Sequence, residues 1–262
     1  MKFKKSLGQN LLIDKNISKK ILSSSSFKNK TIVEIGSGTG NLSVEILKLM
    51  PKKLVCIEKD KVFAKNLSIL FKEIKNLIVI NEDILKLNLN KVISKETIII
   101  GNLPYNISTQ ILIKFIRLDP WPPKYEKIIF MFQKEVGEKI IANLGSKNYS
   151  RLSIITKSRF KILNYFYVSK HCFFPKPKVD SIVIEFQPIV RKDINFKSIK
   201  SLEYITNIFF SNKRKMINKT LKKLKIDDSK FLKDQNIDIT LRPENLSESL
   251  YYKITEYYEK KS

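Results

Sequence analysis

The stretch Thr31-Ile32-Val33-Glu34-Ile35-Gly36-Ser37-Gly38-Thr39-Gly40-Asn41-Leu42 decides the fold that we predict for this chain. A short apolar run rich in β-branched residues leads into alternating glycines, and apolar residues at helical spacing follow as far as Met50. This order predicts a buried strand, a tight glycine turn and a helix. Glycine is needed in such a turn because the backbone bends sharply and lets a ligand approach where a Cβ atom would collide. A tight turn that binds no ligand is the alternative.

Two features separate this turn from the dinucleotide-binding fingerprint G-x-G-x-x-G. Asn41 stands where that fingerprint requires a glycine. The spacing Glu34-x-Gly36-x-Gly38-x-Gly40 instead resembles the first motif of S-adenosylmethionine-dependent methyltransferases, whose ligand has no pyrophosphate. Glu58 closes the next apolar run, at about the distance expected for an acid that accepts hydrogen bonds from both ribose hydroxyls. The glycines and this acid together predict a nucleoside site.

The length and composition of the chain limit its class. With 262 residues, 43% of them hydrophobic, it can form one large domain, or one with a small appendage. No apolar run reaches membrane-spanning length, and the basic stretch 1–8 lacks an apolar signal core, so we expect a soluble, unexported, cytoplasmic protein. Cys56 and Cys172 form neither a disulfide framework nor a metal site. Because His171 is the single histidine, histidine triads and zinc hydrolase sites are not expected, and we predict no metal.

The charge balance points to a polyanionic partner. Fifty Lys and Arg against 25 Asp and Glu give a net charge of +25, an electrostatic footprint typical of nucleic-acid binding. Biased codon usage is the alternative, because Lys, Asn and Ile are abundant along the whole chain.

Strands and helices alternate along most of the chain. Strands are predicted at 31–35, 54–57, 77–80, 97–100 and 128–132, with helices between them that include 61–74, 108–117 and 133–141. Ser108 is the expected N-cap of its helix, and further strands are expected at 153–157, 162–168 and 179–186. The alternation predicts an α/β fold with a doubly wound, mainly parallel sheet.

Ligands of such sheets bind beyond the carboxyl ends of the strands. Four polar or glycine sites fall at those ends: Gly36–Gly40, Glu58, Asp83 and Asn102. Beyond Pro188 the pattern is helical only, with a strongly basic segment at 211–225. We therefore expect a catalytic domain at 1–189 and a small helical domain at 190–262.

The tetrapeptide Asn102-Leu103-Pro104-Tyr105 is suited to the chemistry of an exocyclic adenine amine. That nitrogen is a poor nucleophile because its lone pair is delocalised into the ring. The Asn102 side-chain oxygen and the Leu103 carbonyl can accept hydrogen bonds from the amine, and Tyr105 can stack on a base that has left its helix. Such a site holds the amine in line with a methyl group and needs neither a metal nor a strong base. A proline turn with a capping Asn is the alternative.

The chain resembles ribosomal RNA adenine N6,N6-dimethyltransferases of the bacterial KsgA type over nearly its whole length. The resemblance is carried by these stretches: Lys5-Ser6-Leu7-Gly8-Gln9-Asn10-Leu11-Leu12, Val33-Glu34-Ile35-Gly36, Ile57-Glu58-Lys59-Asp60, Glu82-Asp83, Gly101-Asn102-Leu103-Pro104-Tyr105-Asn106-Ile107-Ser108, Phe132-Gln133-Lys134-Glu135-Val136, Tyr149-Ser150-Arg151-Leu152-Ser153 and Phe173-Phe174-Pro175-Lys176-Pro177-Lys178-Val179. Ser37 and Ser150 depart from a usual proline and a usual glycine.

The resemblance implies a class I, Rossmann-like methyltransferase and a set of residues around S-adenosylmethionine, to which we add Gly38 from the glycine turn. These candidate donor-binding residues are Asn10, Leu12, Gly36, Gly38, Glu58, Asp83 and Asn102. It also implies that Phe173 stacks on the target base opposite Tyr105. An N-cap role for Asp83 and a core position for Phe173 are the alternatives.

The implied substrate is two adjacent adenosines in the 3′-terminal hairpin of 16S ribosomal RNA in the immature small subunit, each methylated twice. Apart from the resemblance, a monomer is our default expectation. Candidate RNA contacts are Arg151, Lys176, Lys178, Lys213, Arg214 and Lys215, although lysines on a solvated helix face are the alternative. Three other functions stay open: methylation of large-subunit RNA of the macrolide-resistance type, DNA adenine methylation, and a ribosome-assembly factor in which methylation is secondary.

Overall fold

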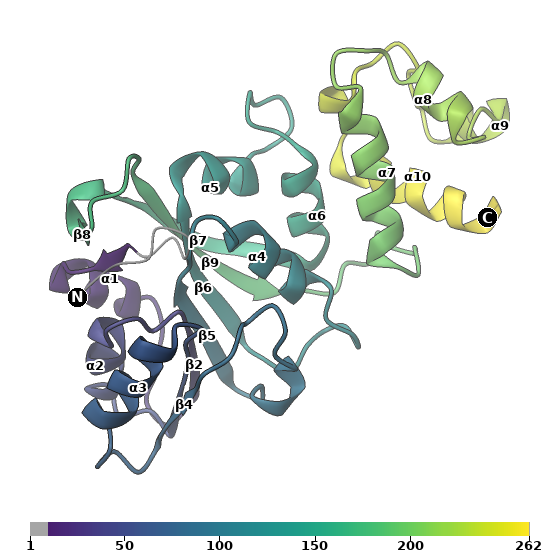
Figure 1. Cartoon of the computed structure of the whole chain (residues 1–262). Helices are drawn as coiled ribbons and strands as arrows, with labels where there is room; N and C mark the ends of the chain where they lie inside the picture. Colours follow the sequence, from purple (N-terminus) through teal and green to yellow (C-terminus); the bar gives the residue numbers. More distant parts are fainter. Residues whose placement is uncertain (1–9, 262) are drawn as a thin grey trace. The chain divides into compact units, whose positions relative to one another are not determined.

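The computed structural model describes residues 10–261 and divides the chain into two compact units (Figure 1). The first unit contains the chain up to Gly137 together with Ile162–Pro188. The second contains Glu138–Lys161 together with the chain from Ile189 onward. The expectation of 1–189 and 190–262 leaves Glu138–Lys161 in the first domain, whereas the structure places it with the helical unit.

A mixed sheet forms the centre of the first unit. The strands of the described chain are β1 (Leu11–Leu12), β2 (Thr31–Ile35), β3 (Lys53–Ile57), β4 (Leu77–Ile80), β5 (Thr97–Asn102), β6 (Lys127–Gln133), β7 (Phe160–Val168), β8 (Phe173–Phe174) and β9 (Ser181–Pro188). The main sheet has the order β4-β3-β2-β5-β6-β9-β7. Its first five strands are parallel, and β9 runs antiparallel to β6. A separate small sheet pairs β1 with β8.

Helices connect the parallel strands and form the second unit. They are α1 (Lys15–Ser23), α2 (Asn41–Leu47), α3 (Lys61–Leu70), α4 (Ser108–Ile116), α5 (Lys134–Ile141), α6 (Arg151–Arg159), α7 (Ile199–Ser211), α8 (Asn218–Lys223), α9 (Ser229–Asp234) and α10 (Glu248–Lys261). Short 3₁₀ helices span Leu89–Lys91, Lys170–Cys172 and Pro243–Asn245.

The central strands are buried on both faces, which explains their near-continuous apolar sequences. Ile32 of β2 and Ile98 of β5 pack in one cluster with Leu42 and Ile46 of α2. On the opposite face, Phe115 of α4 meets Phe130 of β6 edge to face, with ring centroids 5.5 Å apart. Helices on both faces of a mainly parallel sheet are the doubly wound arrangement that the sequence predicts.

Local chemistry ends the strands and starts the helices at one edge of the sheet. The Asp60 carboxylate caps α3 by accepting from the N–H groups of Val62 and Phe63. Gly40 precedes α2 with a φ of 84°, and its N–H donates to the Ser37 carbonyl over 2.8 Å. L residues rarely adopt this φ, and a Cβ atom on Gly40 would also lie 2.9 Å from the Leu67 side chain, so both effects favour glycine. The turn is therefore closed although Ser37 replaces the usual proline.

Two local predictions are wrong. Residues 153–157 belong to helix α6 and not to a strand, because Ser150 and Ser153 form a capping box at its start and the helix packs against α7 and α10. A short apolar run does not distinguish a strand from a buried helix by its period alone. Ser108 is the first residue of α4 and not its N-cap, which is Ile107. The Ser108 hydroxyl instead donates to the Tyr105 carbonyl.

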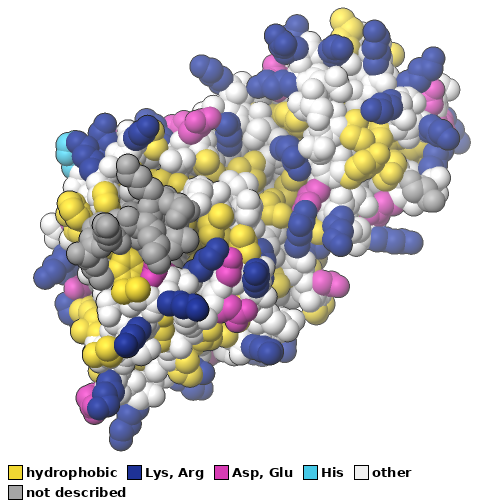
Figure 2. All heavy atoms as spheres, viewed as in Figure 1, with side chains coloured by type: hydrophobic (Ala, Val, Ile, Leu, Met, Phe, Trp, Pro, Cys, Tyr) yellow, Lys and Arg dark blue, Asp and Glu magenta, His cyan; other side chains and the backbone are white. Residues whose placement is uncertain are grey.

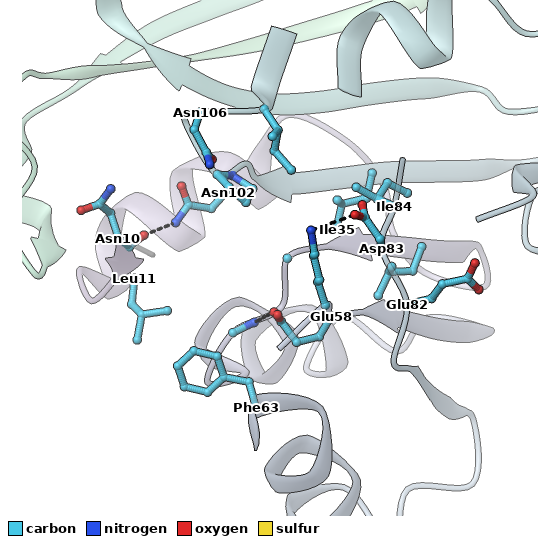
Figure 3. Close-up of a pocket in the computed structure, with 16 residues that line it drawn as sticks. Asn10, Leu11, Ile35, Glu58, Phe63, Glu82, Asp83, Ile84, Asn102 and Asn106 are labelled. Atoms are coloured by element: carbon cyan, nitrogen blue, oxygen red, sulfur yellow. Dashed lines mark hydrogen bonds and ion pairs between the residues drawn. The ribbon is translucent and has the colours of Figure 1, made fainter. Parts of the chain in front are cut away.

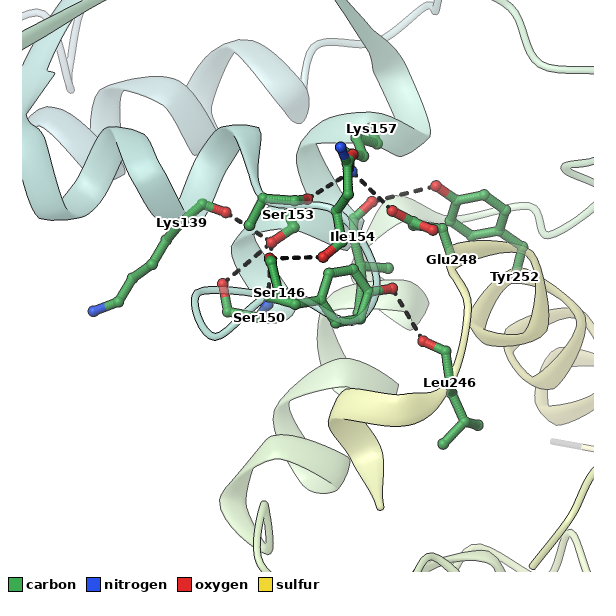
Figure 4. A network of polar contacts seen from close by, with 12 residues as sticks. Lys139, Ser146, Ser150, Ser153, Ile154, Lys157, Leu246, Glu248 and Tyr252 are labelled. Carbon is green, nitrogen blue, oxygen red and sulfur yellow. Dashed lines mark hydrogen bonds and ion pairs between the residues drawn. The ribbon is translucent and has the colours of Figure 1, made fainter. Parts of the chain in front are cut away.

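Polar contacts explain why Glu138–Lys161 belongs to the helical unit (Figure 4). Lys157 donates to the Ala142 carbonyl over 2.6 Å and forms an ion pair with Glu248 at 3.0 Å. The buried Tyr149 hydroxyl donates to the Leu246 carbonyl, which is 97 residues away in sequence. The Lys157–Glu248 ion pair and the Tyr149–Leu246 bond tie the segment to residues at the start of α10.

Candidate active site

A cleft opens at the carboxyl ends of β2, β3, β4 and β5 (Figure 3). The sequence predicts ligand-binding residues at these ends, and the structure brings six of the seven candidates for donor binding into the cleft: Asn10, Gly36, Gly38, Glu58, Asp83 and Asn102. The convergence of residues up to 92 positions apart follows from the parallel order of the strands.

Glu58 is the best-fixed carboxylate of the cleft. It follows β3, is 7% exposed, and accepts from the Gly38 N–H over 2.9 Å and from the Asp60 N–H over 2.8 Å. Burial raises the pKa of Glu58 above its ordinary value, and the two backbone N–H groups oppose that rise. The glycine turn thus holds the carboxylate in one orientation.

The glycine turn also limits how close side chains come to the cleft. A Cβ atom on Gly38 would lie 2.7 Å from Leu11, which lines the same cleft, so the turn and the N-terminal strand are in close contact. A Cβ atom on Gly36 would lie 3.6 Å from the Asn102 carbonyl and 3.7 Å from Pro104. Gly36 therefore brings the first turn against the Asn102 loop.

Asn102 lies at the end of β5, where a hydrogen bond fixes its side chain. Its Nδ2 donates to the Asn10 carbonyl over 2.7 Å (Figure 3). An amide nitrogen only donates, so Oδ1 is the acceptor atom of the Asn102 side chain, and this bond fixes the orientation of the amide that carries it. The bond therefore joins Asn10, which precedes β1, to Asn102, which ends β5, and both residues line the cleft.

Asp83 is paired inside the cleft. Its Oδ2 lies 2.8 Å from the Lys59 Nζ, and its Oδ1 accepts from the Leu85 N–H over 2.9 Å. Burial by itself would raise the pKa of Asp83, but the hydrogen bonds from Lys59 and Leu85 lower it below its ordinary value. Asp83 therefore stays ionised, and it also caps a turn, which is the alternative role that the sequence left open.

Two aromatic candidates lie in different surroundings. Tyr105 is partly buried, and its hydroxyl shares a hydrogen bond with Ser181. Phe173 is 2% exposed and belongs to the core cluster with Leu12 and Val168. The pairing of β8 with β1 places Phe173 in the core, the alternative position that the sequence left open, so its stacking on the target base stays a prediction. The exposed ring of β8 is Phe174, at 58%.

Leu12 is the donor-binding candidate that does not line the cleft. Its side chain is 5% exposed in the core, and its carbonyl accepts from the Asn41 Nδ2 over 3.0 Å. Its neighbour Leu11 lines the cleft instead. Asn41, which excludes the dinucleotide fingerprint, thus holds the N-terminal strand against the glycine turn.

Several residues of the cleft were missed by sequence reasoning. Lys59, Phe63, Ile84 and Asn106 also line it. Each of these residues lies within a few positions of a predicted site residue. Their closeness in sequence to the predicted residues is the feature that could have identified them. No pattern in the sequence shows which neighbour points inward. The motif residues Lys5–Gln9 lie outside the described residues.

The candidate RNA contacts are distributed over both units. Lys176 and Lys178 are exposed in the first unit. In the second, the Arg151 guanidinium donates to Asn207 over 2.9 Å, and Lys213 lies 3.2 Å from Glu244. Arg214 and Lys215 are exposed. Figure 2 shows Lys and Arg side chains over the visible faces of both units, with fewer acidic groups among them.

A second buried carboxyl lies beneath the glycine turn and outside the cleft lining. Glu34 of β2 is 2% exposed and accepts from the Ser43 hydroxyl of α2. Burial raises the pKa of Glu34 to about 7, although the bond from Ser43 opposes the rise. Glu34 is therefore largely protonated in weakly acidic solution.

Within residues 10–261 we find no cluster of three or more metal-ligating side chains. No helix of that range is long and apolar enough to cross a membrane.

Comparison with known proteins identifies relatives along the whole chain. The family described as ribosomal RNA adenine dimethylase matches residues 1–260. A ribosomal RNA small subunit methyltransferase A from Pelagibacter ubique (strain HTCC1062) is 40% identical over 261 residues, 99% of this chain and 98% of the relative. The protein of the same name from Malacoplasma penetrans (strain HF-2) is 38% identical over 255 residues, 95% of this chain and 89% of the relative.

Solved structures agree with these relatives. A dimethyladenosine transferase from Plasmodium falciparum superposes with a TM-score of 0.77 at 27% identity, over 96% of this chain and 98% of that one. The 23S rRNA methyltransferase ErmE superposes with a TM-score of 0.69 at 20% identity, over 95% and 100% of the two chains. At that identity the likeness to ErmE shows the fold alone.

Proposed function

The chain belongs to the ribosomal RNA adenine dimethylase family, and from that membership we propose that it methylates two adjacent adenosines in the 3′-terminal hairpin of 16S rRNA, twice each, at N6. It is an S-adenosylmethionine-dependent methyltransferase with a class I, Rossmann-like fold, as the sequence predicts. The finer points are proposals: the immature small subunit as the particle recognised, a monomeric enzyme, a cytoplasmic location, no metal, and the role of each residue.

The cleft fits an S-adenosylmethionine nucleoside. Glu58 is oriented by the N–H groups of Gly38 and Asp60, and its carboxylate retains lone pairs that suit the two ribose hydroxyls. Asp83 is ionised and can accept from the adenine amine of the donor. The bound donor supplies a methyl group on a positively charged sulfur, which makes that carbon electrophilic. The residues of this chain hold the donor beside the Asn102 loop, against which Gly36 lies.

The observation that carries the proposal is the 2.7 Å bond from the Asn102 Nδ2 to the Asn10 carbonyl. This bond fixes the orientation of the amide, so Oδ1, the acceptor atom of the side chain, has a set position when an amine arrives. Asn102 Oδ1 and the Leu103 carbonyl accept from the two hydrogens of the adenine N6 amine and so turn its lone pair toward the methyl carbon. Most of the rate then comes from holding the two groups in line.

Tyr105 provides the stacking face for the target base in this proposal. Stacking of a base on an aromatic ring contributes about 1–3 kcal/mol, which compensates part of the cost of unstacking. Phe173 would have to leave the core to act as a second face, so the proposal does not depend on it. Arg151, Lys176, Lys178 and the segment 213–215 are proposed to contact RNA phosphates, which position the substrate without reading its sequence.

Mass analysis of ribosomal RNA tests the proposal. Purified unmethylated small and large subunits are incubated separately with the protein and S-adenosylmethionine, and RNA fragments are then weighed. We expect a gain of four methyl groups in the fragment that holds the 3′-terminal hairpin of 16S rRNA. Methylation of the large subunit alone would favour the macrolide-resistance function, and methylation of neither would refute the proposal.

A further inference from the structure

Two hydroxyl groups from distant parts of the chain form a hydrogen bond at the loop that follows Asn102. The Tyr105 hydroxyl lies 2.5 Å from the Ser181 Oγ, across 76 positions of sequence. Tyr105 belongs to the loop between β5 and α4, whereas Ser181 is the first residue of β9, which lies beside β6 in the sheet (Figure 1). Both side chains belong to the first unit.

Ser181 is a fixed point of the sheet. It is fully buried and is paired with Gln133 in the antiparallel β6–β9 ladder. The residue before it is held at two atoms: the Asp180 carbonyl accepts from the Lys134 N–H, and the Asp180 Oδ1 accepts from the Lys170 N–H, each over 2.9 Å. The position of the Ser181 hydroxyl is thus set by the strand, and only its rotation about one bond is free.

The tyrosine is held less firmly by its backbone. Tyr105 lies outside regular structure. The Ser108 hydroxyl donates to the Tyr105 carbonyl over 3.2 Å, a bond to the main chain of the tyrosine and not to its ring. The ring itself turns about two side-chain bonds, so its plane depends on what holds its far end. The bond to Ser181 holds that end. Burial raises the pKa of Tyr105, so the phenol keeps its proton at neutral pH and the bond persists.

A hydrogen bond at the hydroxyl edge does not itself occupy either face of the Tyr105 ring, on which the proposed function stacks the base. Stacking a flipped adenine on that face places its amine beside the Asn102 and Leu103 acceptors only if the ring plane is correct. Fixing the plane of the Tyr105 ring before the substrate arrives means that the entropy of ordering the ring is not lost during the reaction step.

We propose that Ser181 is a positioning residue for the target adenine, which it orients by holding the hydroxyl of Tyr105 and hence the plane of the ring. The inference rests on the proposed function, because it assigns to Ser181 a role toward the base on which that function depends. Ser181 is not among the residues that line the cleft, so its loss should change the methyl-transfer step and leave donor binding intact.

Single and double substitutions test the inference. Tyr105→Phe keeps the ring and removes its hydroxyl, Ser181→Ala removes the partner, and Ser181→Thr restores a hydroxyl at the same position. We expect each of the first two to lower kcat about 10-fold, the size of one lost hydrogen bond, while the affinity for S-adenosylmethionine changes less than twofold. The double variant should be no slower than either single one, because both remove the same bond. Ser181→Thr should recover most of the rate.

Ser158→Ala is the matched control for the stability cost of removing a buried serine hydroxyl. Ser158 is 2% exposed in the second unit, and its Oγ donates to the Ile155 carbonyl. It should lower the melting temperature about as much as Ser181→Ala and leave kcat unchanged.

The outcomes separate the inference from the proposed function. If the wild-type protein methylates RNA and Ser181→Ala matches it in kcat at equal folded concentration, the bond is structural only and the inference is wrong. Additive losses in the double variant would also overturn it. If the wild-type protein methylates neither subunit, the proposed function fails instead.

Discussion

The cleft of the first unit and the basic segment of the second use charge in opposite ways. In the cleft, one carboxylate that is 7% exposed is held by two backbone N–H groups, and one amide is held by a backbone carbonyl. In the helical unit, Lys213, Arg214 and Lys215 are exposed, and Lys213 forms an ion pair with Glu244. The first arrangement fixes atoms, whereas the second supplies only charge.

The contrast predicts how each region responds to substitution. Activity at a site that depends on fixed atoms should be sensitive to the loss of a single hydrogen-bonding group, because a neighbouring group cannot take the place of a misplaced acceptor. A surface that depends on charge should respond to the number of cations and to salt, because screening acts on all of them alike. One substitution should therefore have a large effect in the cleft and a small effect on the basic segment.

The largest effect is expected for Asn102→Ala. The change removes the acceptor for the adenine amine together with the bond to Asn10, and by analogy with loss of one preorganised polar group it should lower kcat about 10²–10³-fold. Binding to the small subunit should stay within about twofold, because the phosphate contacts are unchanged. Single-turnover methylation and filter binding measure the two quantities.

Asn76→Ala is the matched control for that prediction. The Asn76 Nδ2 donates to the Pro51 carbonyl over 2.8 Å, an amide-to-carbonyl bond of the same kind placed before β4, at the other end of the sheet strands. It should leave kcat unchanged. Full growth and subunit assembly in cells that contain only the Asn102→Ala variant would show that an assembly role, and not methylation, is the biologically important one.

A smaller effect is expected for Glu58→Gln. The substitution removes the charge that the Gly38 and Asp60 N–H groups stabilise, and it should weaken donor binding about 10- to 100-fold, as for loss of charged hydrogen bonds. Isothermal titration with S-adenosylmethionine measures it. Glu45→Gln, which is equally buried but lies on α2 and pairs with Lys48, is the control and should bind the donor normally.

The same carboxylate predicts a pH dependence. Because burial raises the pKa of Glu58, it takes up a proton at a higher pH than an ordinary glutamate does. Donor affinity should therefore be constant near neutrality and fall as the pH is lowered through that raised pKa. The Glu58→Gln variant should not show this fall. An equally steep decline in the variant would assign the titration to another group.

Sequence reasoning located this site because its residues follow directly from local patterns. Gly36, Glu58 and Asn102 each end an apolar run, and parallel strands bring such ends to one edge. The doubly wound fold could be predicted for the same reason.

What the sequence did not reveal depends on contacts between distant segments. The pairing of Leu12 with Phe173 decides that the phenylalanine is buried, and no local pattern encodes that partner. The pairing of Lys59 with Asp83 is of the same kind. Helix α6 was mistaken for a strand because its packing against α7 and α10, and not its period, stabilises it.

Glu34→Gln tests whether a buried carboxyl of the first unit that lies outside the cleft also affects donor binding. Glu34 is at least as buried as Glu58 but does not line the cleft, so its replacement should alter stability and not donor binding. Because the pKa of Glu34 is raised in the folded protein, folding favours the protonated carboxyl. The contribution of Glu34 to folding stability is therefore fully present below pH 4.5 and is lost as the pH rises through about 7. By this linkage the loss amounts to at most about 3 kcal/mol.

The neutral glutamine should not undergo that loss. Relative to wild type, Glu34→Gln should gain stability between pH 5 and pH 8, as measured by urea unfolding at the two pH values. If the difference in unfolding free energy between the two proteins is the same at both pH values, the Glu34 carboxyl does not titrate in this range.

The smallest effect per residue is expected on the basic segment. Combining Lys213→Gln, Arg214→Gln and Lys215→Gln should reduce the slope of log K against log salt for RNA binding by about 2, since each phosphate that is no longer neutralised accounts for about 0.7–0.9. The expected change is below that of three full phosphate contacts because Lys213 must first leave Glu244. Lys52→Gln, Lys72→Gln and Lys75→Gln remove the same number of charges from exposed positions of the first unit, near the starts of β3 and β4. If both triple variants lower the slope equally, the binding reflects net charge and not this segment, and the two regions differ less than their geometry indicates.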